Sequence, residues 1–228
     1  MKEYCISKTF PWQGKVTDKV AAVMRMFGLR VDRLNGAGIT HSCQVKIEAG
    51  NIVYITGPSG AGKSVLLKEL EKSIPADDRI NLAEIELADD RAVIDCIEGD
   101  LLTSLKMLST VGLNDCFCVL NSPATLSDGQ KYRFRLAKAL AMEKEFIFAD
   151  EFCSNLDRVT ATVVSYNIQK YAKRMGVTFV LAASQDDILA DLAADVLIIK
   201  ELAGPAEVIY KNCESKEEKP LDAKLQYN

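Results

Sequence analysis

Residues 57–64 read Gly-Pro-Ser-Gly-Ala-Gly-Lys-Ser, and no other stretch constrains the fold of this chain as strongly. The octapeptide fits the pattern G-x-x-x-x-G-K-[ST], which describes a loop that wraps the phosphates of a nucleotide. Its glycines permit tight turns that aim backbone N–H groups inward, and the following helix directs its positive N-terminus at the same anion. The residues expected to contact the nucleotide are Gly57, Pro58, Ser59, Gly60, Ala61, Gly62, Lys63, Ser64 and Val65.

Two side chains of this loop are expected to carry its chemistry. The Lys63 ammonium would lie on the β- and γ-phosphates, and the Ser64 hydroxyl would lie on Mg²⁺. The surrounding sequence supports this interpretation, because residues 51–56 form an apolar run typical of a buried strand and residues 64–73 have the apolar spacing of a helix. Strand, glycine loop and helix follow in the order that phosphate binding requires.

Strand and helix patterns alternate along most of the chain. Short apolar runs at 146–149, 177–183 and 195–200 predict buried strands, and helical spacing is found over 129–142 and 159–175. This alternation predicts an α/β fold with a mainly parallel sheet and helices on both faces. Further strands are expected at 3–10, 43–48, 79–87, 207–210 and around Cys116 and Cys118, and further helices at 15–28 and 101–113.

The composition limits the classes of function. The net charge of −4 and the lack of a basic block argue against a protein that grips naked nucleic acid by charge alone. No apolar window is long enough to cross a membrane and the N-terminus has no signal core, so we expect a cytoplasmic protein that meets a membrane only through a partner. Seven cysteines without a Cys-x-x-Cys pair, and the single His41, predict free thiols rather than a zinc site.

Two adjacent carboxylates, Asp150 and Glu151, follow the predicted strand at 146–149. In a phosphate-loop protein, an Asp at this place holds Mg²⁺ through water, and the next Glu orients and deprotonates an attacking water. The alternative interpretation is a strand that simply ends in polar residues.

A third motif narrows the family. The turn Leu126-Ser-Asp-Gly-Gln130 opens a predicted helix and resembles the signature motif of the ABC (ATP-binding cassette) ATPases. Ser154-Asn-Leu-Asp157 resembles the D-loop of that family, and Gln185 stands where the family carries its switch histidine. With the phosphate loop and the carboxylate pair, these motifs identify the chain, over roughly residues 40–210, as a member of the ABC ATPase superfamily.

The resemblance implies a P-loop NTPase fold of the ABC type, with ATP and Mg²⁺ as cofactors. It also implies a homodimer that forms on ATP binding, in which the phosphate loop of one copy and the signature turn of the other enclose each ATP. Catalytic roles are implied for Lys63, Glu151 and Gln185. Nucleotide contacts are implied for Ser127, Gly129, Gln130 and Asp157, and Mg²⁺ ligands for Ser64, Asp150 and Glu84.

The chain departs from the family pattern at several positions. Gln185 cannot carry a proton as a histidine would, so slow hydrolysis is expected. Asp128 replaces the second glycine of the signature and is expected to cap the helix. Residues 79–87 contain no glutamine for the Mg²⁺-linked glutamine loop, which leaves Glu84 or Glu86 as the candidate.

The aromatic residue that stacks on adenine in this family is also absent from residues 30–45. Phe10, Trp12 and Phe27 remain candidates, although core packing is the favoured role for each. The stretch between Ser64 and Leu126 is short, which predicts a reduced helical subdomain and puts docking on a membrane subunit in doubt.

Three parts are expected along the chain. Residues 1–40 would form a strand–helix extension packed on the core, 41–211 the ABC ATPase domain, and 212–228 a flexible charged tail. The extension is loosely similar to stand-alone ABC ATPases associated with acetyltransferase-like domains. The expected function is a soluble, ATP-hydrolysing, ATP-gated homodimer coupled to a protein or nucleic-acid partner. The alternatives are the ATP-binding subunit of a membrane transporter and a slow-turnover, nucleotide-dependent regulator.

Overall fold

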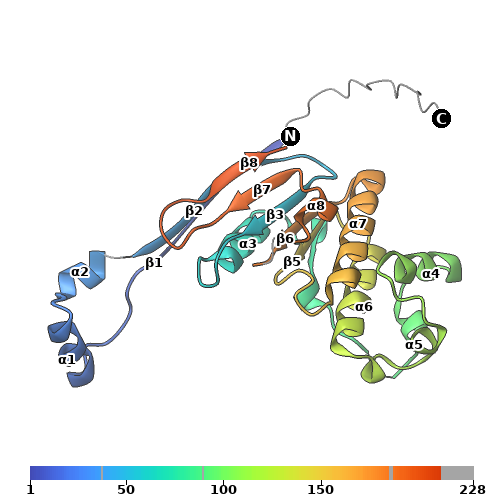
Figure 1. Cartoon of the computed structure of the whole chain (residues 1–228), viewed down its shortest axis with the longest axis horizontal. Coiled ribbons are helices and arrows are strands. Elements are labelled where there is room, and N and C mark those ends of the chain that lie inside the picture. Colours follow the sequence, from blue (N-terminus) through green and yellow to red (C-terminus); the bar gives the residue numbers. More distant parts are fainter. Residues whose placement is uncertain (37, 89, 185–186, 212–228) are drawn as a thin grey trace, which may run out of the picture.

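The computed structural model describes residues 1–36, 38–88, 90–184 and 187–211. Within this part of the chain, a six-stranded sheet in the order β4-β5-β6-β3-β7-β8 lies beside a two-stranded sheet of β1 and β2 (Figure 1). The strands are β1 Lys2–Phe10, β2 Ile39–Ile47, β3 Ile52–Thr56, β4 Arg79–Asn81, β5 Phe146–Ala149, β6 Thr178–Ala182, β7 Val196–Ile199 and β8 Glu207–Tyr210. The helices are α1 Asp18–Met26, α2 Val31–Gly36, α3 Lys63–Lys72, α4 Leu101–Thr110, α5 Cys116–Leu120, α6 Asp128–Ala141, α7 Arg158–Met175 and α8 Leu189–Leu192.

The large sheet is mainly parallel, as the alternation of strands and helices predicts. Strands β4, β5, β6, β3 and β7 run in one direction, and only β8 pairs antiparallel, with β7. Strands β3, β5 and β6 are buried along their whole length, which explains why they read as continuous apolar runs. The predicted α/β class with a parallel sheet is therefore confirmed.

Each face of the sheet has its own core, because successive residues of a strand point to opposite sides. Val53 and Ile55 of β3 pack with leucines of α3 and with the inner residues of β1 and β2. Ile52 and Tyr54 pack on the other face, in the core that α6 and α7 share. Helices thus cover both faces, as predicted.

Two segments that were expected as strands have another structure. The strand at 79–87 ends after Asn81, because the Asn81 side chain accepts from the Ala83 N–H and starts a short 3₁₀ helix over Leu82–Glu84. The segment around Cys116 and Cys118 is the helix α5, because the Asp115 carboxylate accepts from the Phe117 N–H and caps a helical turn.

The N-terminal extension packs on the core only in part. Strand β1 pairs with β2 over its whole length and places Ile6 in the core. Helices α1 and α2, which connect the two strands, lie at the far end of the hairpin, away from the large sheet (Figure 1). The expected tail, 212–228, lies outside the described residues, and the boundary at residue 40 stays a prediction.

The edge strand β4 is tied to α3 by a buried polar cluster that offers a test of the fold. The Glu71 carboxylate of α3 pairs with Arg79 and accepts from the Asn81 amide at 2.8 Å. We expect Glu71→Ala to lower the free energy of unfolding by about 3 kcal/mol, because it leaves the Arg79 charge unpaired in a largely buried place. Urea unfolding measures this change.

Glu69→Ala is the matched control on the same helix, because Glu69 pairs with the exposed Lys72. Its expected cost is below about 1 kcal/mol. Equal costs for the two variants would contradict the structural role of Glu71.

Candidate active site

The predicted catalytic and phosphate-binding residues follow the ends of parallel strands, and these ends lie at one edge of the sheet. The phosphate loop follows β3 and Asp150 follows β5, with β6 between these two strands. The register places Ile55 beside Ala182 and Ala149 beside Leu181. Because neighbouring strands lie about 4.8 Å apart, about 10 Å separates the two strand ends. A phosphate chain bound in the loop would therefore lie within reach of the carboxylates.

The phosphate loop owes its curvature to glycines with positive φ. Gly57, Gly60 and Gly62 have φ of 140°, 80° and 97°, a region that L side chains rarely adopt. Lys63 is buried, and its Nζ donates to the carbonyl oxygens of Gly57 and Pro58 at 2.9 and 3.0 Å. The ammonium is thus held inside the curve of its own loop, where it would meet a bound anion.

His41, which the sequence left as structural or exposed, is buried in β2 against the phosphate loop. A Cβ placed on Gly62 would come within 2.3 Å of the imidazole ring. Burial and the charge of Lys200 lower the pKa of His41, which favours the neutral ring at pH 7. Its Nδ1 has no hydrogen-bond partner among the described residues. His41 therefore packs against the phosphate loop as a neutral side chain.

Phe10 differs in its position from the other two aromatic candidates, Trp12 and Phe27. It ends β1 and meets the His41 ring edge-on, with centroids 5.9 Å apart, yet it stays 46% exposed. Trp12 lies against Gly14, and Phe27 lies at the end of α1. Phe10 is thus linked to the phosphate loop through His41, a link that only the pairing of β1 with β2 creates.

The carboxylate pair lies on a strained turn. Glu151 has a φ of 52° and Cys153 a φ of 58°, although neither is glycine. The surrounding packing holds this turn, because Phe152 and Cys153 are fully buried and the Phe152 N–H donates to the Ala182 carbonyl at 2.9 Å. Glu151 is exposed while Asp150 is partly buried. A strained backbone of this kind can hold a side chain in a direction that an unstrained turn would not give it.

The signature turn begins α6 with a reciprocal capping box. The Ser127 hydroxyl accepts from the Gln130 N–H, and the Gln130 side-chain oxygen accepts from the Ser127 N–H at 2.9 Å. The cap is therefore Ser127 and not Asp128. Asp128 is the first residue of the helix, where its negative charge interacts favourably with the helix dipole. The Gln130 amide also donates to the Cys118 sulfur at 3.0 Å, so Gln130 ties α6 to α5.

The signature turn is fixed to the carboxylate turn of the same chain. A Cβ on Gly129 would lie 3.1 Å from the Asn155 carbonyl oxygen, so the glycine permits close contact. The hydroxyl of the buried Tyr132 accepts from the Cys153 N–H at 3.1 Å. Burial raises the pKa values of both side chains, that of Cys153 to about 12, so both stay neutral. These contacts make α6 and residues 151–157 one unit.

The remaining candidates are placed less directly at the site. Both Asp157 oxygens are engaged by Thr160, at 3.0 Å from its N–H and 2.6 Å from its hydroxyl, so Asp157 caps α7. Glu84 lies in the 3₁₀ helix after β4 and Glu86 in the following loop, and both are exposed. Gln185 lies outside the described residues, and its role stays a prediction.

The profile of the ABC transporter family matches residues 40–154, half of the chain. The chain belongs to the ABC transporter family. The matched residues include the phosphate loop, the signature turn and the carboxylate pair, and they identify an ABC-type ATPase domain. The resemblance seen in the motifs is therefore confirmed.

Curated relatives of this ABC domain are named as ATP-binding proteins of import systems and of a lipoprotein-releasing system. UgpC of Chromohalobacter salexigens, an sn-glycerol-3-phosphate import ATP-binding protein, is 28% identical over 78% of this chain and 56% of its own length. SsuB of Yersinia pestis, for aliphatic sulfonates import, is 30% identical over 74% and 70%. LolD of Anaeromyxobacter dehalogenans, from a lipoprotein-releasing system, is 29% identical over 74% and 86%. The chain spans just over half the length of UgpC.

Solved structures confirm the fold. A dimeric ATP-binding cassette in a post-hydrolysis state, bound to ADP and phosphate, has a TM-score of 0.64 and 18% identity, over 90% of this chain and 96% of that one. In the part of this ABC domain that the structure describes, no helix is long and apolar enough to span a membrane.

The contact between Gly62 and His41 generates a prediction about nucleotide binding. Gly60 and Gly62 both have positive φ, but a Cβ would be free of neighbours at Gly60 and would clash with the ring at Gly62. Backbone strain alone costs about 1–2 kcal/mol in either alanine variant. We therefore expect Gly62→Ala to bind Mg-ATP about tenfold more weakly than Gly60→Ala in a fluorescence titration.

The clash can be separated from the strain by a second substitution. His41→Ala should recover part of the lost affinity in the Gly62→Ala background and none in the Gly60→Ala background. Equal affinities of the two glycine variants, or no recovery, would contradict the proposed packing of His41 on the loop.

Proposed function

We propose that this chain is the ATP-binding subunit of a membrane transporter, working as an Mg²⁺-dependent ATP hydrolase in an ATP-gated homodimer. The observation that carries the proposal is the meeting of the phosphate loop and the Asp150–Glu151 pair at one edge of the parallel sheet. Membership of the ABC family and the names of its relatives support the choice of a transporter.

The nucleotide would lie along the top of the sheet. Lys63 and the N-terminus of α3 hold its phosphates through charge, backbone N–H groups and the helix dipole. Phe10 offers its exposed ring to the adenine, because β1 ends beside the loop at the point where His41 supports it. Stacking on a ring suits adenine without the need for a polar pocket.

The site residues fit Mg²⁺. The Ser64 hydroxyl follows the loop lysine and the Asp150 carboxylate ends β5, and both supply the hard oxygen ligands that this ion prefers. No cluster of three or more His, Cys, Asp or Glu that could hold a metal is present among the described residues. When bound, the ion would neutralise charge on the phosphates. Glu84 stays a weaker candidate, because its strand β4 is three positions from β3 in the sheet.

Glu151 is the proposed general base. It is exposed on the strained turn next to Asp150, where a carboxylate can accept a proton from water that attacks the terminal phosphate. Gln185, which follows β6 in the sequence, would help to orient that water through its amide without taking a proton. This replacement also favours the slow-turnover regulator as a second candidate.

A second copy would complete the site. The signature turn presents the N-terminus of α6, with Ser127 and Gly129 at its start, and such an end binds anionic oxygen well. In the proposed dimer this turn, which is fixed to residues 151–157 of its own chain, would serve the phosphates of the other copy. Gln130 and Asp157 would act there by shaping the turn and the start of α7.

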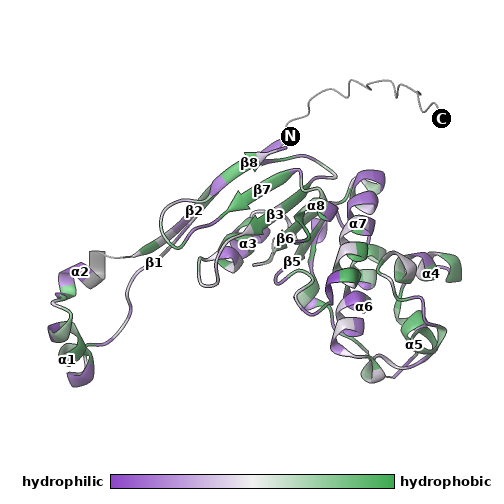
Figure 2. Cartoon of the chain, viewed as in Figure 1, coloured by the Kyte–Doolittle hydropathy of each residue, from purple (hydrophilic) through white to green (hydrophobic). Residues whose placement is uncertain are grey.

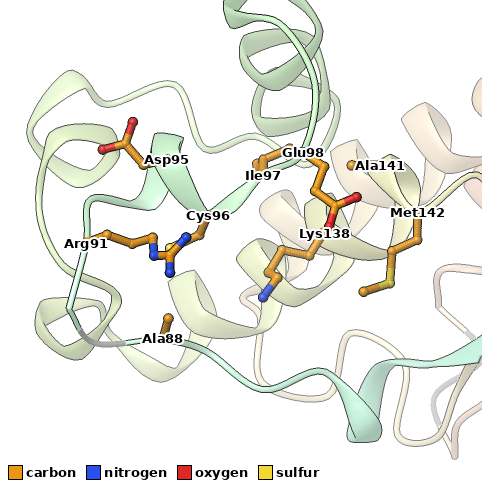
Figure 3. A pocket seen from close by; sticks show the side chains of 9 residues that line it. All are labelled: Ala88, Arg91, Asp95, Cys96, Ile97, Glu98, Lys138, Ala141 and Met142. Atoms are coloured by element: carbon orange, nitrogen blue, oxygen red, sulfur yellow. The ribbon is translucent and has the colours of Figure 1, made fainter.

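A cavity beside the 88–98 segment is the proposed contact for the membrane subunit (Figure 3). Its volume is about 300 Å³, and the cationic Arg91 and Lys138 and the anionic Asp95 and Glu98 line it. None of its nine lining residues belongs to the phosphate loop, the carboxylate pair or the signature turn. The Lys138 amine donates to the Glu86 carbonyl at 2.8 Å, so this cavity is joined to the segment that follows β4.

Glu151→Gln tests the gating by ATP. The amide cannot act as a base, so we expect hydrolysis to fall about a hundredfold or more and an ATP-bound dimer to accumulate. Phosphate release and size-exclusion chromatography with Mg-ATP measure the two effects. A variant that elutes as a monomer with ATP would contradict the shared site. Fractionation of native cells should find the trapped dimer with an integral membrane protein.

Phe10→Ala tests the adenine contact. Loss of base stacking of about 1–3 kcal/mol predicts a dissociation constant for Mg-ADP raised by about tenfold. Isothermal titration with ADP measures this in a single copy, and Phe10→Trp is the control that should keep the affinity. If Phe10→Ala binds ADP as tightly as the unaltered protein, another residue contacts adenine.

A further inference from the structure

The segment between β1 and β2 exposes an apolar surface that the core does not use. We name residues 11–33 the arm. Among the described residues, neither α1 nor α2 contributes a side chain to the two cores, and both helices lie at the far end of the hairpin (Figure 1). Met26 is 81% exposed and Phe27 74%. The other large exposed apolar residues of the arm are Val16, Val23, Leu29 and Val31.

A second exposed apolar surface lies at the opposite end of the molecule. We name residues 94–120, which contain α4 and α5, the lobe. Phe117 is 76% exposed and Leu120 70%, and a groove of about 430 Å³ runs between α4 and α5. Its apolar lining includes Ile94, Leu101, Leu105, Leu113, Val119 and Leu120. Figure 2 shows hydrophobic colour at both ends, on α1 and on α5.

The charges of the two surfaces are opposite in sign. The arm carries five cations against two carboxylates, and the lobe carries four carboxylates against one lysine. The arm thus carries a net positive charge, although the chain as a whole has a net charge of −4. Two surfaces that bind each other have complementary charges, and here charges of opposite sign surround the two apolar centres. The charged residues are Lys15, Asp18, Lys19, Arg25, Arg30, Asp32 and Arg33 in the arm, and Asp95, Glu98, Asp100, Lys106 and Asp115 in the lobe.

One copy cannot join its own arm and lobe, since they lie at opposite ends of the molecule (Figure 1). A two-fold pair joins each arm to the other lobe, and makes the same contact twice. The shared ATP site brings them together. The arm begins directly after Phe10, beside the phosphate loop, and the lobe ends at Leu120, seven residues before Ser127. Seven residues span at most about 25 Å, so a signature turn on the loop brings its α5 close to the start of the arm.

We propose that the arm of each copy docks on the lobe of the second copy and locks the ATP-bound dimer. Met26 and Phe27 enter the contact as apolar anchors, and the cations around them face the lobe carboxylates. This inference rests on the dimer of the proposed function and names a contact outside the nucleotide site. A basic amphipathic helix also suits an anionic membrane. The second copy is favoured because the same chain supplies an exposed apolar surface of opposite charge.

The test uses the full chain with Glu151→Gln, whose ATP-bound dimer can be measured by analytical ultracentrifugation. Met26→Ser with Phe27→Ser in the arm, or Phe117→Ser with Leu120→Ser in the lobe, should each raise the dimer dissociation constant about tenfold or more. The four substitutions together should add little, because both pairs remove one contact. Met175→Ser, an exposed methionine of α7 outside both surfaces, should leave the constant unchanged.

Charge reversal gives a rescue that loss of folding cannot imitate. Lys19→Glu with Arg25→Glu, or Asp95→Lys with Glu98→Lys, should weaken the dimer, and all four together should restore it. Binding of ADP to the single copy should be unchanged in every arm variant, which confirms the fold.

The outcomes separate the two proposals. If Glu151→Gln alone stays monomeric with ATP, the proposed function fails and the arm contact falls with it. If it dimerises and the arm and lobe variants dimerise as tightly, only the arm contact is overturned. Arm variants that keep the dimer but lose binding to phosphatidylserine vesicles would overturn it in favour of a membrane.

Discussion

The parallel, in-register pairing of β5, β6 and β3 is the constraint on which the rest of the structure depends. Because the strands run in one direction, the backbone segments that leave them emerge at the same edge. The phosphate loop and the carboxylate pair are far apart in sequence, yet this pairing sets their strand ends about 10 Å apart. The strands stay in register because large side chains such as Tyr54, Phe148 and Phe179 are fully buried between them and the helices.

A second constraint joins the signature turn to this edge. Tyr132 reaches from α6 to the backbone of Cys153, and Gly129 allows the turn to touch the Asn155 carbonyl. One chain therefore holds the phosphate loop and the start of α6 in a fixed relation. The carboxylate turn belongs to the same unit. If α6 shifted when the chain closed against a second copy, Glu151 would therefore move with it. ATP binding and pairing would in this way act on one mechanical unit.

The fold accommodates additions where they do not disturb these contacts. The arm is inserted between β1 and β2, beyond Phe10, so the hairpin can carry it without altering the pairing that places Phe10 and His41. The helical part between α3 and α6 is small, but it retains the two elements that matter, a charged cavity beside the 88–98 segment and the apolar lobe. Asp95 and Glu98 belong to both of these elements, because they line the cavity and also lie in the lobe.

By itself, the sequence determined the phosphate loop, the capped signature helix and the alternation of buried strands with helices. These features are local, because glycine conformations, helix caps and apolar periodicity act over a few residues. The tertiary structure alone decided that His41 supports Gly62, that Phe10 rather than Trp12 or Phe27 stands by the loop, and that Val23 and Met26 of α1 face outward. The physical reason is that each depends on which distant segment lies alongside, and the pairing of β1 with β2 fixes that for most of them.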